Sequence, residues 1–448
     1  MSRFLALGVV VGMMGSGLAA EKVPTPAERG RKALTGRAFV PASVSFAGYE
    51  NLWKVWGLKE KPADFAKQLQ KRYGLHPAEY PNNNLPMGLR EAAGPLGKGI
   101  GFDCMLCHAS SLFGKSIMGL GNASLDFQGL FEDFAAAEGY KLKMAYPLSN
   151  VRGTTEASAS SVYLLQFRHP NLEVKLDKPN QFKYSAENCE DTPAWWLMKK
   201  KKTLYHTGSH DVRGVRSLMA FMLNPLNRGE YVKSQEETFK DIRAYLLSLE
   251  APKYPFPIDQ KLAEQGRLVF NDHCARCHGT YGEQWTYPNK IIDLKTIGTD
   301  PSLINAFGED VEAFYNQSWL GQEKDSQGKL LQSRITGGYQ APPLDGVWAT
   351  APYFHNGSVP TLADVLNSKG RPRVFTRGFG TDKEDYDTLK VGWKVTILKE
   401  SPGKLPSTAE NRRIYDTTQP GRSNSGHTFG DKLTDSERKA VIEYLKTL

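Results

Sequence analysis

The sequence predicts a mainly α-helical protein made of two domains with the same plan, long loops and little sheet. Three observations predict this fold class. Apolar residues recur at helical spacing behind capping residues, one short cysteine motif occurs twice, and 42 glycines and 26 prolines imply many turns. A length of 448 residues with 40% hydrophobic residues is enough for two or three domains and more than one core.

Composition excludes several classes of protein. The balance of apolar and charged residues is that of a globular chain, which excludes a disordered chain, a collagen-like fibre and a polytopic membrane protein. Five cysteines are too few for a disulfide scaffold. The formal net charge of +9 is compatible with nucleic acid, an anionic surface or an acidic protein as partner.

The first 20 residues are predicted to form a secretory signal peptide. Arg3 supplies a short basic region, residues 4–18 are an uncharged apolar run, and small residues precede Glu21. An uncleaved N-terminal anchor is the alternative. No later segment is long and apolar enough to cross a bilayer. We therefore expect a periplasmic or secreted protein with no integral membrane span after cleavage, and no nucleic-acid partner.

Two C-x-x-C-H motifs are the strongest chemical signal. Thiols three positions apart can form thioethers with the two vinyl groups of one porphyrin, and the adjacent histidine can bind the iron. Zinc would need a further pair of ligands, and a redox dithiol does not need the histidine. The sequence therefore predicts two covalently bound c-type haems. Their binding residues are Cys104, Cys107 and His108, then Cys274, Cys277 and His278.

The expected helices follow these motifs. Residues 259–270 form a helix with Asp259 as N-cap, which leads into the second motif. A capping box at Thr434 and Glu437 opens the last helix, and Ser234 with Glu237 suggests a matching box earlier.

The two helices that follow these boxes end alike. Residues 242–249 and 441–448 share Tyr, Leu, Ser or Thr, and Leu in register. We therefore predict haem domains at 21–250 and 258–448, joined by a linker at 251–257 that contains three prolines.

The sixth iron ligand decides what each haem can do. A six-coordinate haem transfers electrons, whereas an open iron can bind oxygen or peroxide. The second domain has no methionine, because none follows Met222. His273 is too close to Cys274 to reach the other face. His427, on a loop before the last helix, is the preferred ligand, His355 is the alternative, and an open or lysine-ligated iron is the third option.

The first haem has several candidate ligands, and nothing in their spacing selects one. An apolar distal wall without a ligand is equally compatible with the aromatic residues of this domain, among them Trp195, Trp196 and Phe221. The lysines at 199–202 are either a solvated helix end or a docking patch for an acidic redox partner. The leftover Cys189 receives no role. The candidate ligands are Met118, Met144, Met198, Met219, Met222, His76, His169, His206 and His210.

Residues 342–362 read PPLDGVWATAPYFHNGSVPTL. Together with the two C-x-x-C-H motifs, this stretch resembles the dihaem c-type cytochromes of the bacterial cytochrome c peroxidase and MauG superfamily, and most closely the rubber oxygenase A-like branch. The ending NSGH at 424–427, followed by a final helix, also resembles that branch.

The resemblance implies roles for individual residues. The C-terminal haem would transfer electrons with His427 as sixth ligand, where the peroxidases usually carry methionine. The N-terminal haem would be reactive, with an open or oxygen-bound distal face. Phe221, which follows an alanine, would lie in the distal pocket, and Trp195 or Trp196 would lie near both haems. Calcium binds between the domains of some members, but no local ligand cluster here argues for it.

Three functional hypotheses follow. The first is a haem-dependent oxidoreductase, dioxygenase- or peroxidase-like, that uses oxygen or peroxide as a small-molecule oxidant and a redox protein as electron partner. The second is a non-catalytic electron carrier with two six-coordinate haems. The third is a haem sensor or a structural subunit, for which the sequence offers no extra signalling domain.

Overall fold

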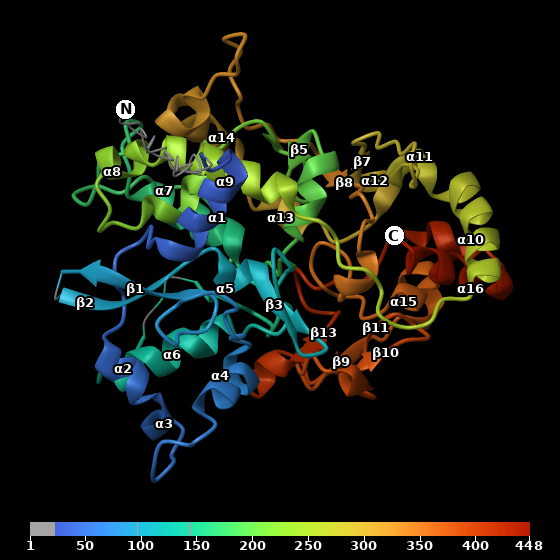
Figure 1. Ribbon diagram of the computed structural model, residues 1–448, viewed down its shortest axis with the longest axis horizontal. Helices are drawn as coiled ribbons and strands as arrows, with labels where there is room; N and C mark the ends of the chain where they lie inside the picture. The colour runs from blue at the N-terminus through green and yellow to red at the C-terminus, as the bar shows by residue number, and fades with distance from the viewer. Residues whose placement is uncertain (1–22, 96, 143, 145) are drawn as a thin grey trace, which may run out of the picture.

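The computed structural model describes residues 23–95, 97–142, 144 and 146–448 (Figure 1). The signal peptide predicted at 1–20 lies outside these residues. The described chain is mainly helical with a few small antiparallel sheets, as predicted. Within the described residues, no helix is long and apolar enough to cross a membrane.

The elements are short, and loops connect most of them. The α-helices are α1 Pro26–Gly36, α2 Phe46–Glu50, α3 Leu52–Val55, α4 Phe65–Tyr73, α5 Met105–His108, α6 Phe127–Ala137, α7 Ala157–Gln166, α8 Gly229–Ser234, α9 Glu236–Ser248, α10 Gln260–His273, α11 Ala275–His278, α12 Leu294–Ile297, α13 Ser302–Asn305, α14 Glu309–Gln317, α15 Leu362–Leu366 and α16 Asp435–Leu445. The 3₁₀ helices are η1 Trp195–Lys200, η2 Arg216–Leu223, η3 Trp319–Gln322, η4 Val347–Ala349, η5 Ser368–Gly370, η6 Lys383–Asp385, η7 Asn411–Arg413 and η8 Thr428–Lys432.

The strands of the described residues form five two-stranded antiparallel sheets and one three-stranded sheet of order β12-β9-β13. The other pairs are β1-β2, β3-β4, β5-β6, β7-β8 and β10-β11. The strands are β1 Leu89–Gly94, β2 Gly97–Phe102, β3 Ala109–Leu112, β4 Lys115–Met118, β5 Thr203–Leu204, β6 His210–Asp211, β7 Ile291–Asp293, β8 Gly338–Gln340, β9 Val374–Thr376, β10 Tyr386–Asp387, β11 Gly392–Trp393, β12 Thr396–Ile397 and β13 Ile414–Asp416.

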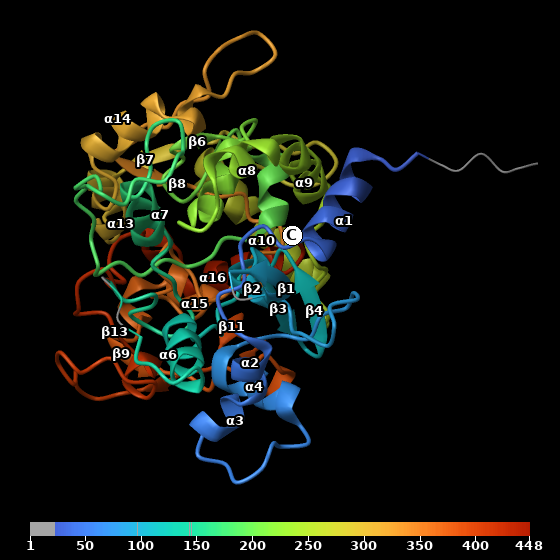
Figure 2. The ribbon, with the colours of Figure 1, turned by 90° about the vertical axis from the view of Figure 1, so that its left-hand side faces the viewer.

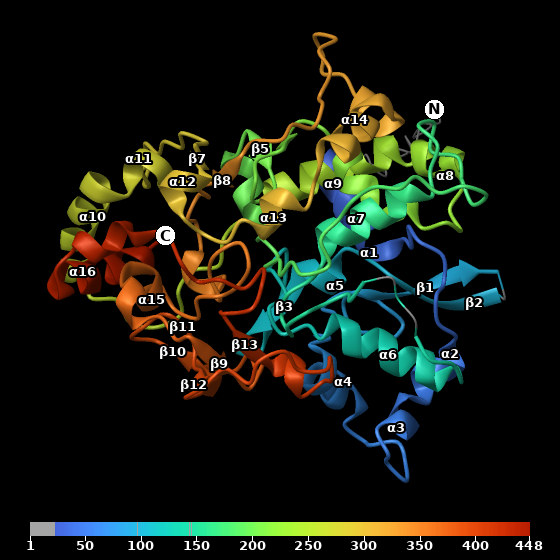
Figure 3. The same ribbon diagram turned by 180° about the vertical axis from the view of Figure 1, so that it is seen from behind.

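Two helix pairs repeat one packing arrangement. Helix α1 packs against α9, and α10 packs against α16 (Figures 1 and 3). A Cβ on Gly30 of α1 would lie 1.9 Å from the Asp241 carbonyl oxygen, and one on Gly266 of α10 would lie 1.9 Å from the Ala440 carbonyl oxygen. Glycine is therefore required at both crossings, because only its bare backbone allows so close an approach. Helix α1 was not expected from the sequence.

The helix caps were predicted correctly at two of three places. The Asp259 side chain accepts the Leu262 N–H, and Thr434 with Glu437 forms the expected capping box. The box expected at Ser234 and Glu237 was wrong. Ser234 is the last residue of α8, and its hydroxyl donates to the Tyr231 carbonyl instead of capping α9.

The two halves of the chain interleave. Helix α14 and η3 come from the second half, yet Val311, Tyr315 and Leu320 belong to the main apolar core of the first half. Figure 2 shows α14 on the same side as α7 and α8. Arg412 reaches back to Asp126 at the start of α6, so the last third of the chain is tied to the first. The predicted linker at 251–257 carries no helix or strand, and the domain division there remains a prediction.

Candidate haem-binding sites

The second C-x-x-C-H motif lies where α10 ends and α11 begins. The Cys274 N–H continues the hydrogen bonding of α10 to Phe270, and the motif then turns through α11. The His278 Nδ1 donates to the Pro342 carbonyl oxygen over 2.8 Å. Because Nδ1 carries the proton, the lone pair is on Nε2, which is the arrangement that metal-binding histidines commonly adopt.

His427 faces His278. Their ring centres lie 6.2 Å apart, with the planes inclined by 61°. A metal–imidazole bond is about 2 Å and a ring nitrogen lies about 1 Å from its ring centre, so two rings that share one metal ion have centres about 6 Å apart. The spacing of the two rings therefore fits one iron between them.

The backbone around His427 is held in a fixed, unusual shape. His427 has φ 47° and Gly426 has φ 74°, which turns the loop sharply before η8. The His427 N–H donates to the Ile297 carbonyl. The Arg371 guanidinium donates to the carbonyl oxygens of Asn424 at 2.6 Å, Gly426 at 2.7 Å and His427 at 3.3 Å. Arg371 thus fixes the loop that presents the imidazole.

A cavity of about 260 Å³ contains both histidines and both cysteines of the second motif. Its apolar wall includes Phe270, Leu344, Val441 and Leu445. Burial lowers the pKa of His427 to about 3 and also lowers the pKa of His278. Both imidazoles are therefore neutral at physiological pH, as iron ligands must be. The cavity, the two facing imidazoles and the cysteines fit a covalently bound haem.

The thiols do not resemble a redox pair. All five cysteines are unbridged. Burial raises the pKa of Cys107 to about 12 and that of Cys274 to about 11. Reactive C-x-x-C dithiols have depressed thiol pKa values, so the environment here is the opposite. The described residues contain no group of three or more His, Cys, Asp or Glu side chains arranged for a metal ion.

The first motif lies on α5, between β2 and β3. The His108 ring stacks on the Trp195 indole, with centres 4.8 Å apart and planes inclined by 21°. Burial lowers the pKa of His108 to about 4, so this imidazole is also neutral. Cys104 packs against the same apolar core as Trp195, Met198 and Met219. A neutral, half-buried histidine beside two half-buried cysteines fits attachment of a haem here too.

The two neighbouring tryptophans belong to different cores. Trp195 lies in the core of the first half, with Phe221 packed nearby against Phe239. Trp196 is buried in the core of the second half, and its indole N–H donates to the Asp345 carbonyl over 2.8 Å. One peptide bond therefore joins side chains that reach into both halves. The resemblance offered either tryptophan as the one near both haems, and the sequence did not choose between them.

The histidines considered as ligands of the first haem differ in their surroundings. His76 is buried and uses both ring nitrogens, with Ser111 at 2.8 Å and Ser124 at 2.9 Å. His169 is exposed, and His206 lines the cavity of the second motif. His210 is flanked by Tyr205 and Tyr315, and its Nε2 is buried without a hydrogen-bond partner.

The methionines proposed for the first haem lie mostly in the core of the first half. Met198, Met219 and Met222 are buried members of that core, and Met118 packs against it. Met144 packs against a separate small cluster around Tyr146. Burial in a core is also the ordinary setting of a structural methionine, so the surroundings select none of them.

His355 does not face His278. Its ring stacks on Tyr339, with centres 4.0 Å apart, and lies 6.4 Å from the His206 ring. The four-lysine run is not a continuous exposed patch either. Lys199 pairs with Glu250 and Lys200 with Asp345, and of the four lysines Lys202 is the exposed one.

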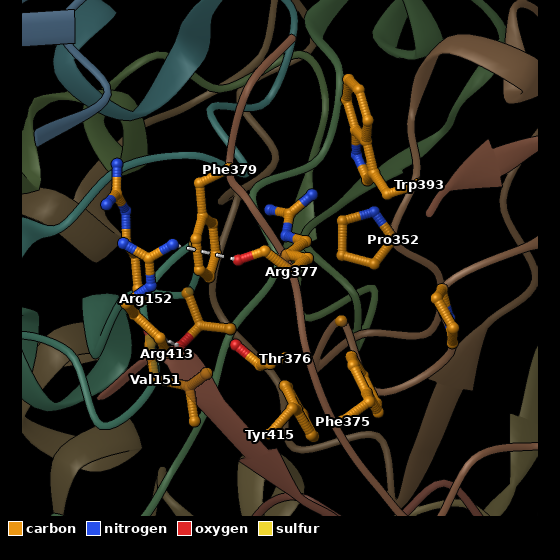
Figure 4. Close-up of a pocket in the computed structure, with 14 residues that line it drawn as sticks. Val151, Arg152, Pro352, Phe375, Thr376, Arg377, Phe379, Trp393, Arg413 and Tyr415 are labelled. Carbon is orange, nitrogen blue, oxygen red and sulfur yellow. Dashed lines mark hydrogen bonds between the residues drawn. The ribbon is translucent and has the colours of Figure 1, made fainter. Parts of the chain in front are cut away.

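A second, small pocket of about 20 Å³ lies at the seam between the halves (Figure 4). Arg152 and Arg377 each lie 4.6 Å from the centre of the Phe379 ring, and Arg413 lies 5.5 Å from it. Burial lowers the pKa of Arg377 to about 9. The space suits about one water molecule, so this pocket is a packed junction. The sequence did not single out these arginines, because they carry no motif.

One segment of the chain that contributes to this site is similar to a known protein family. Residues 338–376 match the family described as RoxA-like, cytochrome c-like. The segment includes Pro342, which orients His278, and Arg371, which holds the His427 loop. The match supports the cytochrome c-like part of the predicted resemblance at this segment, and the superfamily and its branch remain proposals.

Two curated relatives come from Sinorhizobium fredii. The uncharacterized protein y4iJ is 32% identical over 264 residues, which is 45% of this chain and 41% of the relative. The uncharacterized protein y4iM is 29% identical over 292 residues, which is 57% of this chain and 64% of the relative. The chain thus spans less than two thirds of either relative.

Solved structures give distant likenesses. Hydrazine synthase of Kuenenia stuttgartiensis is 13% identical, with a TM-score of 0.29 over 68% of this chain and 95% of that chain. A MauG-like protein associated with microbial copper homeostasis is 15% identical, with a TM-score of 0.29 over 68% and 91%. Both are too distant to establish a shared fold.

Proposed function

We propose that this chain is a periplasmic or secreted dihaem c-type oxidoreductase. The haem of residues 258–448 transfers electrons, and the haem of residues 21–250 reacts with oxygen or peroxide. The facing pair of His278 and His427 is the main support for the proposal, because it would occupy both axial positions of one haem iron. This assignment agrees with the family resemblance at residues 342–362.

The residues that would hold each haem have distinct tasks. Haem c supplies one-electron redox chemistry and, where a coordination position is open, chemistry with oxygen or peroxide. The Pro342 carbonyl fixes the proton of His278 on Nδ1, so Nε2 is free to bind. The carbonyls held by Arg371 keep the His427 ring aimed at the same point. His108 would bind the first iron, with Cys104 and Cys107 as thioether donors.

The stretch from Pro193 to Trp195 supports coupling between the two sites. Pro193 and Ala194 line the cavity of the second motif, while Trp195 stacks on His108. One peptide bond therefore separates Ala194, at one haem site, from Trp195, whose ring contacts the proposed ligand of the other. We propose Trp195 as the aromatic group between the haems. Phe221 would border the reactive haem, and Trp196 would anchor η1 in the second core.

Electron paramagnetic resonance of the ferric protein, with and without cyanide or azide, tests the proposal. The expected spectrum combines one low-spin signal that ignores added ligand with one high-spin signal that converts. A His427→Ala variant should make the ligand-insensitive signal high-spin, whereas a His355→Ala variant should not. Two low-spin signals that ignore added ligand would contradict the reactive assignment.

A non-catalytic electron carrier is the second candidate. The buried Nε2 of His210 has no hydrogen-bond partner, which suits a ligand that completes the first iron site. In that case both haems would be six-coordinate, and His210→Ala would create a high-spin signal. Electron exchange with an acidic partner would then fall steeply with ionic strength.

A further inference from the structure

The cavity of the second motif has a polar section built by the first half of the chain. Lys201 and His206, together with His355 from the second half, line the same cavity as Cys274 and His278. These groups are separate from the two proposed iron ligands. This section of the cavity therefore suits a negatively charged group.

Lys201 is a cation without a counterion. Its Nζ is 3.4 Å from the Tyr205 carbonyl oxygen, which is a long contact for a hydrogen bond. Among the described residues, no carboxylate forms an ion pair with it, whereas its neighbours Lys199 and Lys200 are both paired. Burial lowers the pKa of Lys201 to about 8. Such a group is stabilised when an anion enters the cavity.

His355 offers a further donor, whereas His206 already gives its ring proton to a carbonyl oxygen. The His206 Nε2 is bonded to the Asp191 carbonyl oxygen over 2.7 Å, so its ring is fixed in place. His355 is 7% exposed, and its ring nitrogens make no hydrogen bond within the described part of the chain. Its ring is held flat against Tyr339. Asp191 lines the same cavity, and burial raises the pKa of its carboxyl well above the usual range, which weakens its repulsion of an anion.

We propose that Lys201 and His355, beside the fixed ring of His206, form a carboxylate-binding section that receives the propionate groups of the haem attached at Cys274 and Cys277. The inference rests on the proposed function, since it needs a haem in this cavity. Thioether attachment fixes the vinyl edge of the macrocycle at the cysteines, so the propionates extend away from them. Residues 201–206 belong to the first half of the chain, so side chains of the first half would contact the second haem directly.

The proposal predicts a shift in reduction potential. Reduction adds an electron to the haem, and a nearby ammonium stabilises the added charge. A Lys201→Gln variant should therefore have a lower midpoint potential at the ligand-insensitive haem. Lys202→Gln is the matched control, because Lys202 is the exposed neighbour. Lys201→Arg keeps the charge and should restore most of the potential.

The experiment uses the full holoprotein. Intact mass first confirms two covalent haems, and paramagnetic resonance confirms a low-spin second haem, so failure of the proposed function is recognised separately. Spectroelectrochemistry then gives the potential, and resonance Raman spectroscopy reports the propionate bending band. Lys201→Gln and His355→Gln should shift that band, while Lys202→Gln should not.

A free carboxylate is the competing occupant. If the section binds one, acetate or succinate added to the wild-type holoprotein will change the potential, and the propionate band will be the same in Lys201→Gln and wild type. That result would overturn the propionate assignment. An unchanged potential and band in Lys201→Gln, with both haems present, would overturn the proposal altogether.

Discussion

The His108 imidazole lies flat against the Trp195 indole, 4.8 Å from ring centre to ring centre. The stack joins the proposed ligand of the first haem to a segment that lines the cavity of the second. A stacked pair of this kind also fixes the orientation of the imidazole, because offset stacking adds about 0.5–1.5 kcal/mol beyond area burial.

Trp195→Leu should slow electron transfer between the haems. The variant removes the stack but retains an apolar side chain, and we expect a loss of about tenfold, or ~1.4 kcal/mol of barrier. Flash reduction followed at the two haem absorbances measures the rate. Trp195→Phe is the control because it keeps an aromatic ring. Equal rates in both variants would exclude a role for the ring.

Arg371→Gln should release His427 from the second iron. The guanidinium donates to three loop carbonyls, and hydrogen bonds to charged groups are worth about 1.5–3 kcal/mol each when one partner is removed. We expect a high-spin fraction at the second haem. Arg438→Gln is a matched control, since Arg438 holds the carbonyls of Leu366, Gly430 and Asp431 but not the 424–427 loop. An identical spectrum in both variants would make Arg371 merely structural.

Arg412→Ala should destabilise the whole molecule. Arg412 is 2% exposed and pairs with Asp126 at 3.2 Å and Glu132 at 3.1 Å. Removing one partner of a buried pair leaves an uncompensated charge, which costs about 3–5 kcal/mol. Urea unfolding measures the loss. The double variant with Asp126→Asn should lose less than the sum of the single variants, and simple additivity would show that the pair is not coupled.

His76→Gln should reduce the dependence of stability on acid pH. Burial lowers the pKa of His76 from 6.5 to about 4. The unfolded chain therefore binds more protons between these values, so stability rises with pH from about 4 and is fully present above 6.5, a span of about 3 kcal/mol. Chemical denaturation across this range checks the slope. His169→Gln, at an exposed site, should leave the slope unchanged.

Much of the candidate site could be predicted from the sequence, because it depends on residues that are close together in the chain. The C-x-x-C-H spacing, the absence of methionine after Met222, and the caps at Asp259 and Thr434 are contained in short stretches. Ser234 was misassigned for the same reason. Its sequence context suits a cap, but the preceding residues form α8 and engage its hydroxyl there.

Other features depend on residues far apart in the chain. The sequence offered both His355 and His427 as ligands, and the tertiary structure turned one toward His278 and the other toward His206. It likewise separated Trp195 from Trp196 and brought Lys201 into the same cavity as Cys274, which is 73 residues further along the chain. The residues around Arg371 do not indicate that it holds the His427 loop. Those around Gly30 do not indicate that α1 crosses α9 there.

The sequence by itself determined the chemistry of the protein. The two cysteine motifs, the expected helices and the few candidate axial ligands can each be identified from short stretches of the chain. Only the tertiary structure decided which side chains meet. The approach of His278 to His427 joins residues 149 positions apart, and the stack of His108 on Trp195 joins residues 87 positions apart. Local propensity carries no information about contacts between residues so far apart in the chain.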